Sequence, residues 1–319
     1  MEYFLDLKDK KLLTEIEMNA RISHTSLAKK VGLSKHVVKY RIEKLEEENI
    51  IQGYNAIIDS NKLGETIYVI YLKLIKISST QEKRWMEEIG KNPAVITVGK
   101  NAGFWDLTLV IKSKDNQELN QLLEKILENK LENIKEKKIT SEIESSYFNL
   151  KLIHESKNIE FSTSNKQDKI AIDEIDKKIL NFLANNCRIG LVDISIKLKM
   201  SPNGVKDRIK KLEKNKIIIG YKTKINYEEL GYLHYRVFLH FRKMNDDIYI
   251  KIRQFLRNKQ NVESVSKYIG YADIDFRCYS KNLVGFYLLI SEIKDNFLQN
   301  IIEIDSMPIF SWEKIEYYK

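Results

Sequence analysis

The chain has 319 residues, of which 43% are hydrophobic and 31% are charged, and its formal net charge is +9 at pH 7. This composition excludes a disordered chain, and no apolar run approaches the roughly twenty residues of a membrane-spanning helix. The two cysteines, Cys187 and Cys278, lack the spacing of a zinc site or a disulfide framework. The acidic start has no signal-peptide pattern, so we expect a cytoplasmic protein. We also expect no cofactor.

The sequence is an internal repeat with a constant offset of 167 residues. The stretch LSKHVVKYRIEKLEEENIIQGY from Leu33 matches MSPNGVKDRIKKLEKNKIIIGY from Met200 at twelve of its 22 positions. The register begins at Leu5 and persists to Gly64, so sixty residues form one repeated module. We refer to the two halves of the chain as copy one and copy two.

The module begins with three short helices. In copy one, Asp6 suits the N-cap of a first helix, a second helix is expected near residues 25–31, and Ser34 caps a third. The corresponding features of copy two are Asp173, residues 192–198 and Ser201. Three short helices with tight connections predict a winged or three-helix helix-turn-helix domain.

Strand-like alternation follows the helices in each copy. Copy one predicts a strand, a helix, two strands, a helix and a strand, at residues 66–77, 81–91, around 102–103, 116–132 and 138–150. Copy two repeats this order at residues 233–244, 247–259, around 270, 283–299 and 306–317. The order is that of a ferredoxin-like βαββαβ sandwich, so the predicted fold class is α+β.

Four domains and a linker result. We expect helix-turn-helix domains at residues 1–60 and 172–230, and sandwich domains at 61–154 and 231–319. Residues 155–171, which include ESKNIEFSTSNKQDK, are polar and without a clear period, and we expect a flexible linker there.

The third helix of each module presents polar side chains opposite its apolar stripe. Such a helix fits the major groove, with its first turn against base edges and its cations on phosphates. A solvated amphipathic face is the other interpretation, which the repeated order of helices disfavours. The expected DNA contacts are Ser34, Lys35, His36, Lys39, Tyr40, Arg41, Ser201, Asn203, Lys206, Arg208, Lys210 and Lys211.

The first module resembles the DNA-binding module of the Lrp/AsnC (feast/famine) transcriptional regulators. The resemblance rests on the pattern that begins at Leu5, LDxxDxxLLxxxxxNARISxxxLAKKVGLSxxxVxxRIxxLExxxIIxGY. The βαββαβ module is similar to that family's effector-binding and assembly domain. The resemblance implies an effector role for Gly103, Asp106, Gly270 and Asp273, which match the family's Gly-x-x-Asp turn. Turn chemistry alone would call for the same residues, because glycine and aspartate both favour turns.

Members of this family work as dimers, and a tandem chain can supply both halves itself. We therefore predict an intramolecular pseudo-dimer with two non-identical heads that binds double-stranded DNA and an effector such as an amino acid. We expect no contact with a membrane and no enzymatic activity, and further homo-oligomerisation stays open. Two alternatives also stay open, since some relatives with this plan act as siroheme decarboxylases and others could coat DNA without sequence preference.

Two histidines, His234 and His240, lie six positions apart on a predicted strand and therefore share a face. As a metal or cofactor pair they lack a third ligand, so we expect packing or rim roles for them and no metal site.

Overall fold

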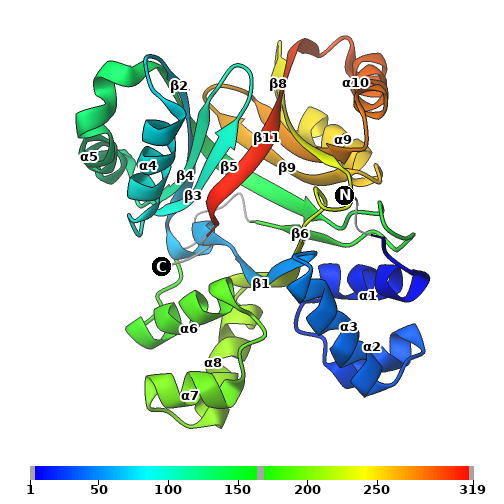
Figure 1. Cartoon of the computed structure of the whole chain (residues 1–319). Coiled ribbons are helices and arrows are strands. Elements are labelled where there is room, and N and C mark those ends of the chain that lie inside the picture. Colours follow the sequence, from blue (N-terminus) through cyan, green and yellow to red (C-terminus); the bar gives the residue numbers. More distant parts are fainter. Residues whose placement is uncertain (1–3, 164–168, 316–319) are drawn as a thin grey trace.

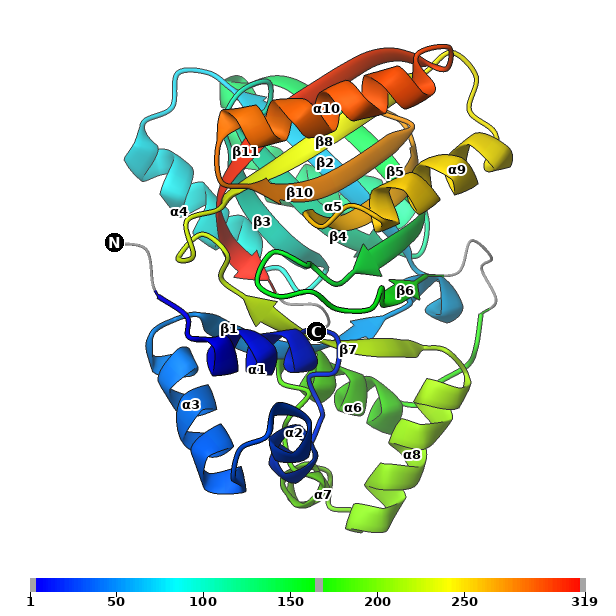
Figure 2. The same ribbon diagram turned by 90° about the vertical axis from the view of Figure 1, so that its right-hand side faces the viewer.

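A computed structural model describes residues 4–163 and 169–315 of the chain, the last five of these by their backbone alone. Two groups of three helices lie at one end, and a large curved sheet flanked by helices lies at the other (Figure 1). A two-stranded ribbon lies between the two ends (Figure 2). No helix in the described part of the chain is long and apolar enough to cross a membrane.

The helix-turn-helix modules form as predicted. Copy one has α1 (Leu7–Glu17), α2 (His24–Val31) and α3 (Lys35–Glu47), and copy two has α6 (Glu174–Asn185), α7 (Leu191–Leu198) and α8 (Pro202–Lys214). Asp6 caps α1 in a capping box with Asp9, because each side chain accepts a hydrogen bond from the other residue's backbone N–H. Asp173 accepts the matching bond from the N–H of Asp176.

The ribbon joins the two modules. It pairs β1 (Ile51–Ile58) with β7 (Ile218–Ile225) in antiparallel register, with Tyr54 opposite Thr223. The first strands predicted after the helices were at residues 66–77 and 233–244, so neither the two strands of the ribbon nor their pairing with each other was predicted. This pairing places both modules on one shared apolar core, which contains Leu12 of α1 and Leu180 of α6.

Each copy then forms its predicted sandwich, with strand and helix ends shifted by a few residues. Copy one has β2 (Thr66–Leu74), α4 (Ser79–Gly90), β3 (Val95–Asn101), β4 (Leu107–Ser113), α5 (Asn116–Leu127), the 3-10 helix η2 (Glu128–Asn133) and β5 (Ile134–Phe148). Copy two has β8 (Leu233–Phe241), α9 (Asp246–Arg257), β9 (Val262–Ile269), β10 (Ile274–Ser280), α10 (Leu283–Phe297) and β11 (Ile301–Ile315). A short 3-10 helix, η1 (Ser60–Leu63), precedes β2.

The two sandwiches close into one ring of strands. The strand order is β2-β4-β3-β11-β8-β10-β9-β5, and β5 pairs again with β2. This closure follows from the length of β5 and β11, which have 15 residues each whereas their neighbours have seven to nine. The first half of β5 pairs with β2 of its own copy and the second half pairs with β9 of the other, and β11 does the same with β8 and β3.

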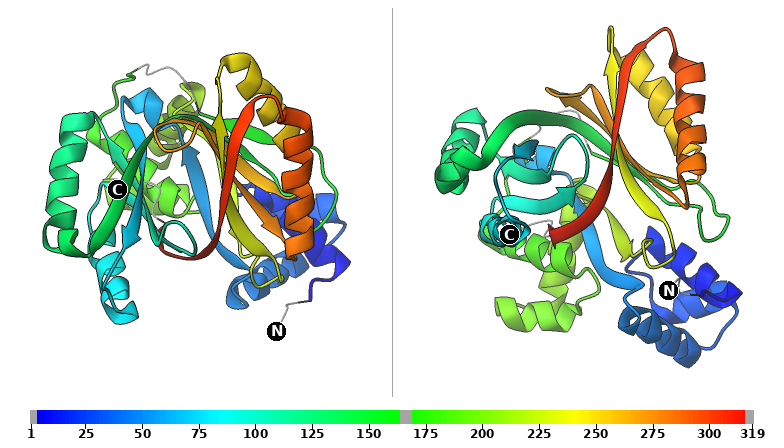
Figure 3. Two further views of the ribbon diagram at one scale, coloured as in Figure 1. Left: turned by 90° about the horizontal axis from the view of Figure 1, so that it is seen from above. Right: turned by 45° about the horizontal axis from the view of Figure 1, so that its top comes forward.

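Helices cover the outside of the ring in two pairs. Helices α4 and α5 lie on one flank and α9 and α10 on the other (Figures 1 and 3). Each pair buries its own apolar cluster against the sheet. A third cluster, which includes Tyr71, Trp105, Phe238 and Met307, is made of residues from both copies. Because eight strands leave an interior just wide enough for side chains or one small ligand, these residues fill part of the ring.

The prediction of a wholly flexible linker at residues 155–171 is wrong in its first part. Residues Glu160–Ser162 form strand β6, which pairs with the end of β5. The side chain of Asn149 holds the return of the chain, since its Nδ2 donates to Ser156 Oγ at 2.7 Å and its Oδ1 accepts from the N–H of Ile159 at 2.7 Å. Residues 164–168 of the predicted linker lie outside the described residues.

Candidate functional site

The third helices α3 and α8 expose the side chains expected to meet DNA. Within them, the buried residues are Val38, Ile42 and Leu45 in α3 and Val205, Ile209 and Leu212 in α8. The expected DNA contacts that lie exposed are Ser34, Lys35, His36, Lys39, Tyr40, Ser201, Asn203, Lys206, Lys210 and Lys211. Both helices lie at the end of the molecule away from the ring (Figure 2).

Four of the expected DNA contacts have a structural role. Arg41 forms ion pairs of 2.7 Å with both Asp6 and Asp9, so it ties the start of α1 to α3. Arg208 repeats this with Asp173 and Asp176 at 2.7 and 2.8 Å. Ser34 and Ser201 cap their helices by accepting from backbone N–H groups. Contact of all twelve residues with DNA stays a prediction.

The two modules hold each other through reciprocal contacts. Arg21 Nη1 donates to the backbone oxygen of Cys187 at 2.9 Å, and Arg188 Nε donates to that of Ala20 at 2.6 Å. The same two arginines form cation–π pairs with the ribbon of the opposite copy, Arg21 over Tyr221 and Arg188 over Tyr54. These contacts repeat at the 167-residue offset, as in a two-fold dimer interface, and fix the two third helices relative to each other.

The predicted effector residues of copy one contact the end of strand β2. The Oδ2 of Asp106 accepts from the N–H of Leu74 at 2.6 Å, and its Oδ1 pairs with Lys73 Nζ at 3.1 Å. Lys73 also donates to the backbone oxygen of Gly103, whose φ is +115°. Gly103 thus supplies the positive φ of the turn, whereas the side chain of Asp106 bonds to β2 and not within the turn; binding of an effector by these residues stays a prediction.

The equivalent turn of copy two has a tighter fit. Asp273 accepts from the N–H of Phe241 at 2.7 Å, as Asp106 does from Leu74. Gly270 has a φ of +137°, and a Cβ there would lie 2.6 Å from the backbone oxygen of Ile139 in β5. Glycine is required at this position, because no other residue would let the turn approach the strand so closely.

A cavity of about 470 Å³ lies between the ribbon and the ring of strands. Its volume falls in the range of small-molecule sites. The ribbon contributes Asn55, Ile57, Lys222 and Lys224, and the rest of the lining comes mainly from strands of both sandwiches. A molecule in this cavity would therefore touch the ribbon that carries the DNA-binding modules.

The two copies give this cavity opposite walls. Copy two supplies His234, Arg236, Glu263, Asp275 and Arg277. The positions 167 residues earlier carry Ile67, Val69, Ile96, Thr108 and Val110. At these five pairs of positions copy two is charged and copy one is almost wholly apolar, so the cavity has a charged side and an apolar patch made by Ile67, Val69, Ile96 and Val110.

Arg236 is the buried cation of the charged wall. Its Nε pairs with Asp275 Oδ2, and its guanidinium lies 5.3 Å from the centroid of the Tyr71 ring. Burial opposes the charge, but Asp275 and Tyr71 hold the pKa of Arg236 above its usual value. The Nη1 atom is buried and makes no hydrogen bond to the described residues. A buried donor without a partner is costly, so this atom is available to an acceptor that enters the cavity.

The remaining cations of the cavity differ in how far they are paired. Lys222 forms an ion pair of 2.7 Å with Glu263. Burial alone would raise the pKa of Glu263, but Lys222, Arg277 and His234 hold it well below its usual range. Burial lowers the pKa of Lys224, whose ammonium has no ion-pair partner among the described residues. Lys224 is thus a second cation able to bind an anionic group.

Two carboxyl groups in the cavity take up protons near neutral pH. Burial raises the pKa of Glu17 to about 7, although Lys222 and two hydrogen bonds oppose the shift. These bonds come from the N–H of Leu150 at 3.0 Å and the O–H of Tyr227 at 3.2 Å. Burial likewise raises the pKa of Glu142 to about 7. Carboxyl groups shifted this far are frequent in binding and catalytic sites.

The sequence interpretation missed this cavity, although the sequence carried a signal for it. A strand that is apolar in copy one, TIYVIYLKL, reads LHYRVFLHF in copy two, with a histidine and an arginine on the inward-facing positions. Comparing the copies position by position would have found His234 and Arg236. The closure of the ring, which buries them, could not be seen in this way.

Comparisons with known proteins agree with the helix-turn-helix modules. A family model for a winged helix-turn-helix DNA-binding domain matches residues 5–52 and 172–219. An uncharacterized HTH-type transcriptional regulator of Pyrococcus abyssi is 33% identical over 124 residues, which are 38% of this chain and 82% of that protein. The chain belongs to the Lrp/AsnC family of helix-turn-helix transcriptional regulators. The proline dehydrogenase transcriptional activator of Rhodobacter capsulatus is 34% identical over 125 residues, 38% of this chain and 80% of that protein.

A solved structure also matches the tandem arrangement of this Lrp/AsnC chain. The siroheme decarboxylase NirDL covers 98% of this chain and 94% of its own, with a TM-score of 0.64 and 13% identity. The expectation that the chain has no enzymatic activity is therefore corrected, because the fold over nearly its whole length is also that of an enzyme. At this identity the likeness shows a shared fold alone.

Proposed function

We propose that this Lrp/AsnC chain is a sequence-specific transcriptional regulator of the cytoplasm, in which one polypeptide supplies both DNA-binding heads. The reciprocal contacts of Arg21 and Arg188 support this proposal most directly, since they fix α3 and α8 in one rigid unit. Two-fold pairing of this kind presents recognition helices to successive major grooves about one turn of DNA apart. Fusion makes the pairing independent of protein concentration.

The two heads offer different groups to base edges. Copy one exposes His36 and Tyr40, whereas the aligned positions of copy two are Asn203 and Asp207. Asparagine can bind adenine with two hydrogen bonds, and an aspartate facing the groove can accept from a cytosine amino group. The proposed DNA site is therefore two dissimilar half-sites rather than a palindrome.

Selection of bound duplexes from a random library tests this proposal. The expected result is one motif with two unlike halves about one helical turn apart, bound far more tightly than random DNA at the same salt concentration. An inverted repeat would contradict the two unequal heads, and equal affinity for random DNA would indicate an architectural protein instead.

The regulator is proposed to respond to an amino acid bound in the cavity. The carboxylate would meet Arg236 Nη1 and Lys224, the ammonium group would meet Glu142, and an apolar side chain would pack on Ile67 and Val110. Mixed charges opposite an apolar wall support this class of ligand. The Gly-x-x-Asp turns, with Asp106 and Asp273, are the alternative predicted place for the same effector.

Anisotropy of labelled DNA with each of the twenty amino acids in turn tests this response. We expect amino acids of one chemical class to change the DNA affinity of the full chain. This change should be lost in Arg236→Met and kept in Asp106→Asn, the matched variant at the turn. Loss in Asp106→Asn alone would move the effector to the turn. If no amino acid had an effect, the cavity would not serve as an amino-acid sensor.

A second candidate function is enzymatic, and the cavity favours it through Glu17 and Glu142, whose pKa values of about 7 suit proton transfer. Siroheme is the first probe, because a siroheme decarboxylase shares the fold. Its absorption spectrum would shift on binding, and its product would be followed by mass. The lining has more carboxylates than Lys and Arg, which is unfavourable for a polycarboxylate. An unchanged spectrum would exclude siroheme as the substrate.

A further inference from the structure

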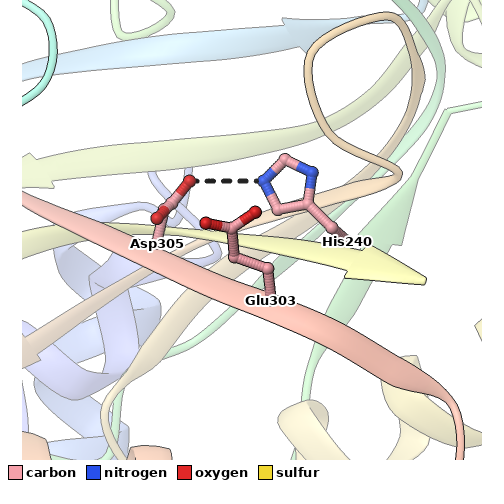
Figure 4. Close-up of side chains that lie close together, drawn as sticks. All are labelled: His240, Glu303 and Asp305. Carbon is pink, nitrogen blue, oxygen red and sulfur yellow. Dashed lines mark ion pairs between the residues drawn. The ribbon is translucent and has the colours of Figure 1, made fainter. Parts of the chain in front are cut away.

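Three side chains with metal-ligating groups converge where β8 meets β11. They are His240 on β8 and Glu303 and Asp305 on β11, and they point toward one another (Figure 4). Glu303 is the direct cross-strand partner of His240, and Asp305 lies two residues further on the same face. One ligand atom from each of the three lies within 4.8 Å of the other two.

We propose that this triad binds a divalent transition-metal ion of the Zn²⁺ class. The distance from His240 Nε2 to Asp305 Oδ2 is 3.4 Å. Two ligand atoms at about 2.1 Å from a tetrahedral metal are themselves about 3.4 Å apart, so this pair is already at the required separation. Glu303 is exposed and can complete the set by rotating its side chain. One nitrogen and two carboxylates favour Zn²⁺, Co²⁺ or Mn²⁺ over the all-oxygen ions Mg²⁺ and Ca²⁺.

The charges around the triad support a bound cation. No Lys or Arg among the described residues forms an ion pair with Glu303 or Asp305. The Nε2 atom of His240 is buried and makes no hydrogen bond to the part of the chain that the structure describes. Two carboxylates thus face an imidazole nitrogen whose polar contact among the described residues is the 3.4 Å pair with Asp305 drawn in Figure 4, and no Lys or Arg supplies a charge there. A metal ion would satisfy this arrangement.

A second layer of contacts already orients the triad. The O–H of Tyr271 donates to Asp305 Oδ2 at 3.1 Å, and the Tyr271 ring packs edge-on against His240 with centroids 5.4 Å apart. Tyr271 is itself held by contacts with Tyr71 and Trp105. Partners that hold the ligands of a metal in place contribute strongly to its affinity. Tyr271 belongs to the Gly270–Asp273 turn, so the proposed metal site adjoins the predicted effector turn of copy two.

Copy one provides a built-in control for this proposal. The positions aligned with His240, Glu303 and Asp305 are Lys73, Glu136 and Lys138. There Lys138 pairs with Glu136 at 3.1 Å, and Lys73 pairs with Asp106 at 3.1 Å. Lysines supply the positive charge in copy one, whereas copy two has none at these positions and needs an external cation.

This site also revises the sequence interpretation of the two histidines. His234 and His240 lie six positions apart, about 20 Å along β8, so they do not act as a pair. His234 lines the cavity by the ribbon and stacks on Tyr279 at 4.2 Å. The ligands that His240 lacked in its own strand come from the neighbouring one, which the sequence alone could not show.

The test uses the full chain without a histidine tag, stripped with a chelator and titrated with ZnCl₂ by calorimetry and with CoCl₂ by visible absorption. We expect one Zn²⁺ per chain and the intense Co²⁺ bands of a low-coordinate site with nitrogen and oxygen ligands. His240→Gln and Asp305→Asn should each weaken Zn²⁺ at least tenfold and abolish these bands, whereas Glu136→Gln should bind within twofold of the native chain. Far-ultraviolet circular dichroism would confirm that each variant is folded.

Several results would overturn the proposal. If the three residues formed only an ion pair, Zn²⁺ would bind the native chain no more tightly than His240→Gln. Weak Co²⁺ bands like those of the hydrated ion would also exclude the site. So would equal binding in Asp305→Asn, since another histidine would then hold the metal.

Discussion

The inner faces of the two sandwiches differ in chemistry, although their strands align residue for residue. Around the cavity, copy one places Val69 and Val110 where copy two places Arg236 and Arg277. In a symmetric dimer of copy two, arginines would face arginines across the same small space. Their repulsion and the loss of hydration would be costly. A fused chain avoids this cost, because these aligned positions can be charged in one half and apolar in the other.

The largest expected effect of this difference between the copies lies at the buried pair of Arg236 and Asp275. Asp275→Thr installs the residue of copy one and leaves the Arg236 charge buried without its partner. We expect the free energy of unfolding to fall by about 3–5 kcal/mol. Adding Arg236→Val, which completes the copy-one pair, should restore most of the loss. Urea denaturation of the two variants measures both changes.

The matched change in copy one should cost far less. Thr108 accepts a hydrogen bond of 2.8 Å from Asn101 Nδ2, and Thr108→Val removes that bond without burying a charge. We expect a loss of about 1 kcal/mol. If Asp275→Thr cost no more than Thr108→Val, then Arg236 would not depend on its ion pair.

The next largest effect concerns pH and Glu17, whose counterpart in copy two is Ala184. Burial raises the pKa of Glu17 from its ordinary value of 4.5 to about 7. The folded state therefore binds the proton more tightly than the unfolded chain does. Stability from this group is fully present below pH 4.5 and is lost as the pH rises through 7. The loss is about 3 kcal/mol at 1.36 kcal/mol per pKa unit.

Glu17→Gln isolates this effect, because the amide keeps an acceptor for the N–H of Leu150 but does not titrate. Between pH 5 and pH 8, we expect the free energy of unfolding of the native chain to fall by about 3 kcal/mol more than that of the variant. Denaturant unfolding measures this difference. Glu142 titrates over the same range in both proteins, so its contribution cancels. Parallel pH profiles would show that Glu17 is already ionised in the folded state.

The local features of the fold could be predicted from the sequence because they depend on nearby residues. Asp6, Ser34 and Ser201 act as helix caps within three residues of their partners, and the alternating strands and the two third helices follow from short-range periodicity. The repeat also predicted that the two halves would pair. Short-range patterns of this kind are what a single sequence records best.

The enclosure of the cavity and the convergence of the metal triad could not be predicted, because both depend on which strands become neighbours. Asp305 meets His240 only through the register of β11 on β8. Arg236 becomes buried only because β5 and β11 extend past their own sheets and close the ring. A pattern of alternation fixes which face a residue takes, but not the strand that will lie beside it.

The third helices should differ in how strongly they hold phosphates. Lys39 in copy one forms an ion pair of 3.5 Å with Glu43, whereas Lys206 and Lys210 form no ion pair among the described residues. We expect Lys206→Ala with Lys210→Ala to weaken binding of every DNA sequence about tenfold and to reduce the salt slope by about 2. Lys35→Ala with Lys39→Ala should have a smaller effect. Anisotropy titrations at several salt concentrations distinguish the two, and equal losses would remove the asymmetry.

The smallest expected effect lies at the ends of α2 and α7, where both copies need a left-handed residue. Gly32 takes a φ of 65° at no steric cost, whereas Lys199 is held at 53° with a side chain that disfavours this conformation. Lys199→Gly should therefore raise the free energy of unfolding by up to about 1 kcal/mol. Gly32→Ala should lower it by a similar amount, since the added Cβ would meet only Lys8 Nζ at 3.6 Å and brings no second charge beside it. Thermal unfolding of the two variants measures both signs. A loss of stability in Lys199→Gly would mean that the lysine side chain makes a contact worth more than the strain of its backbone.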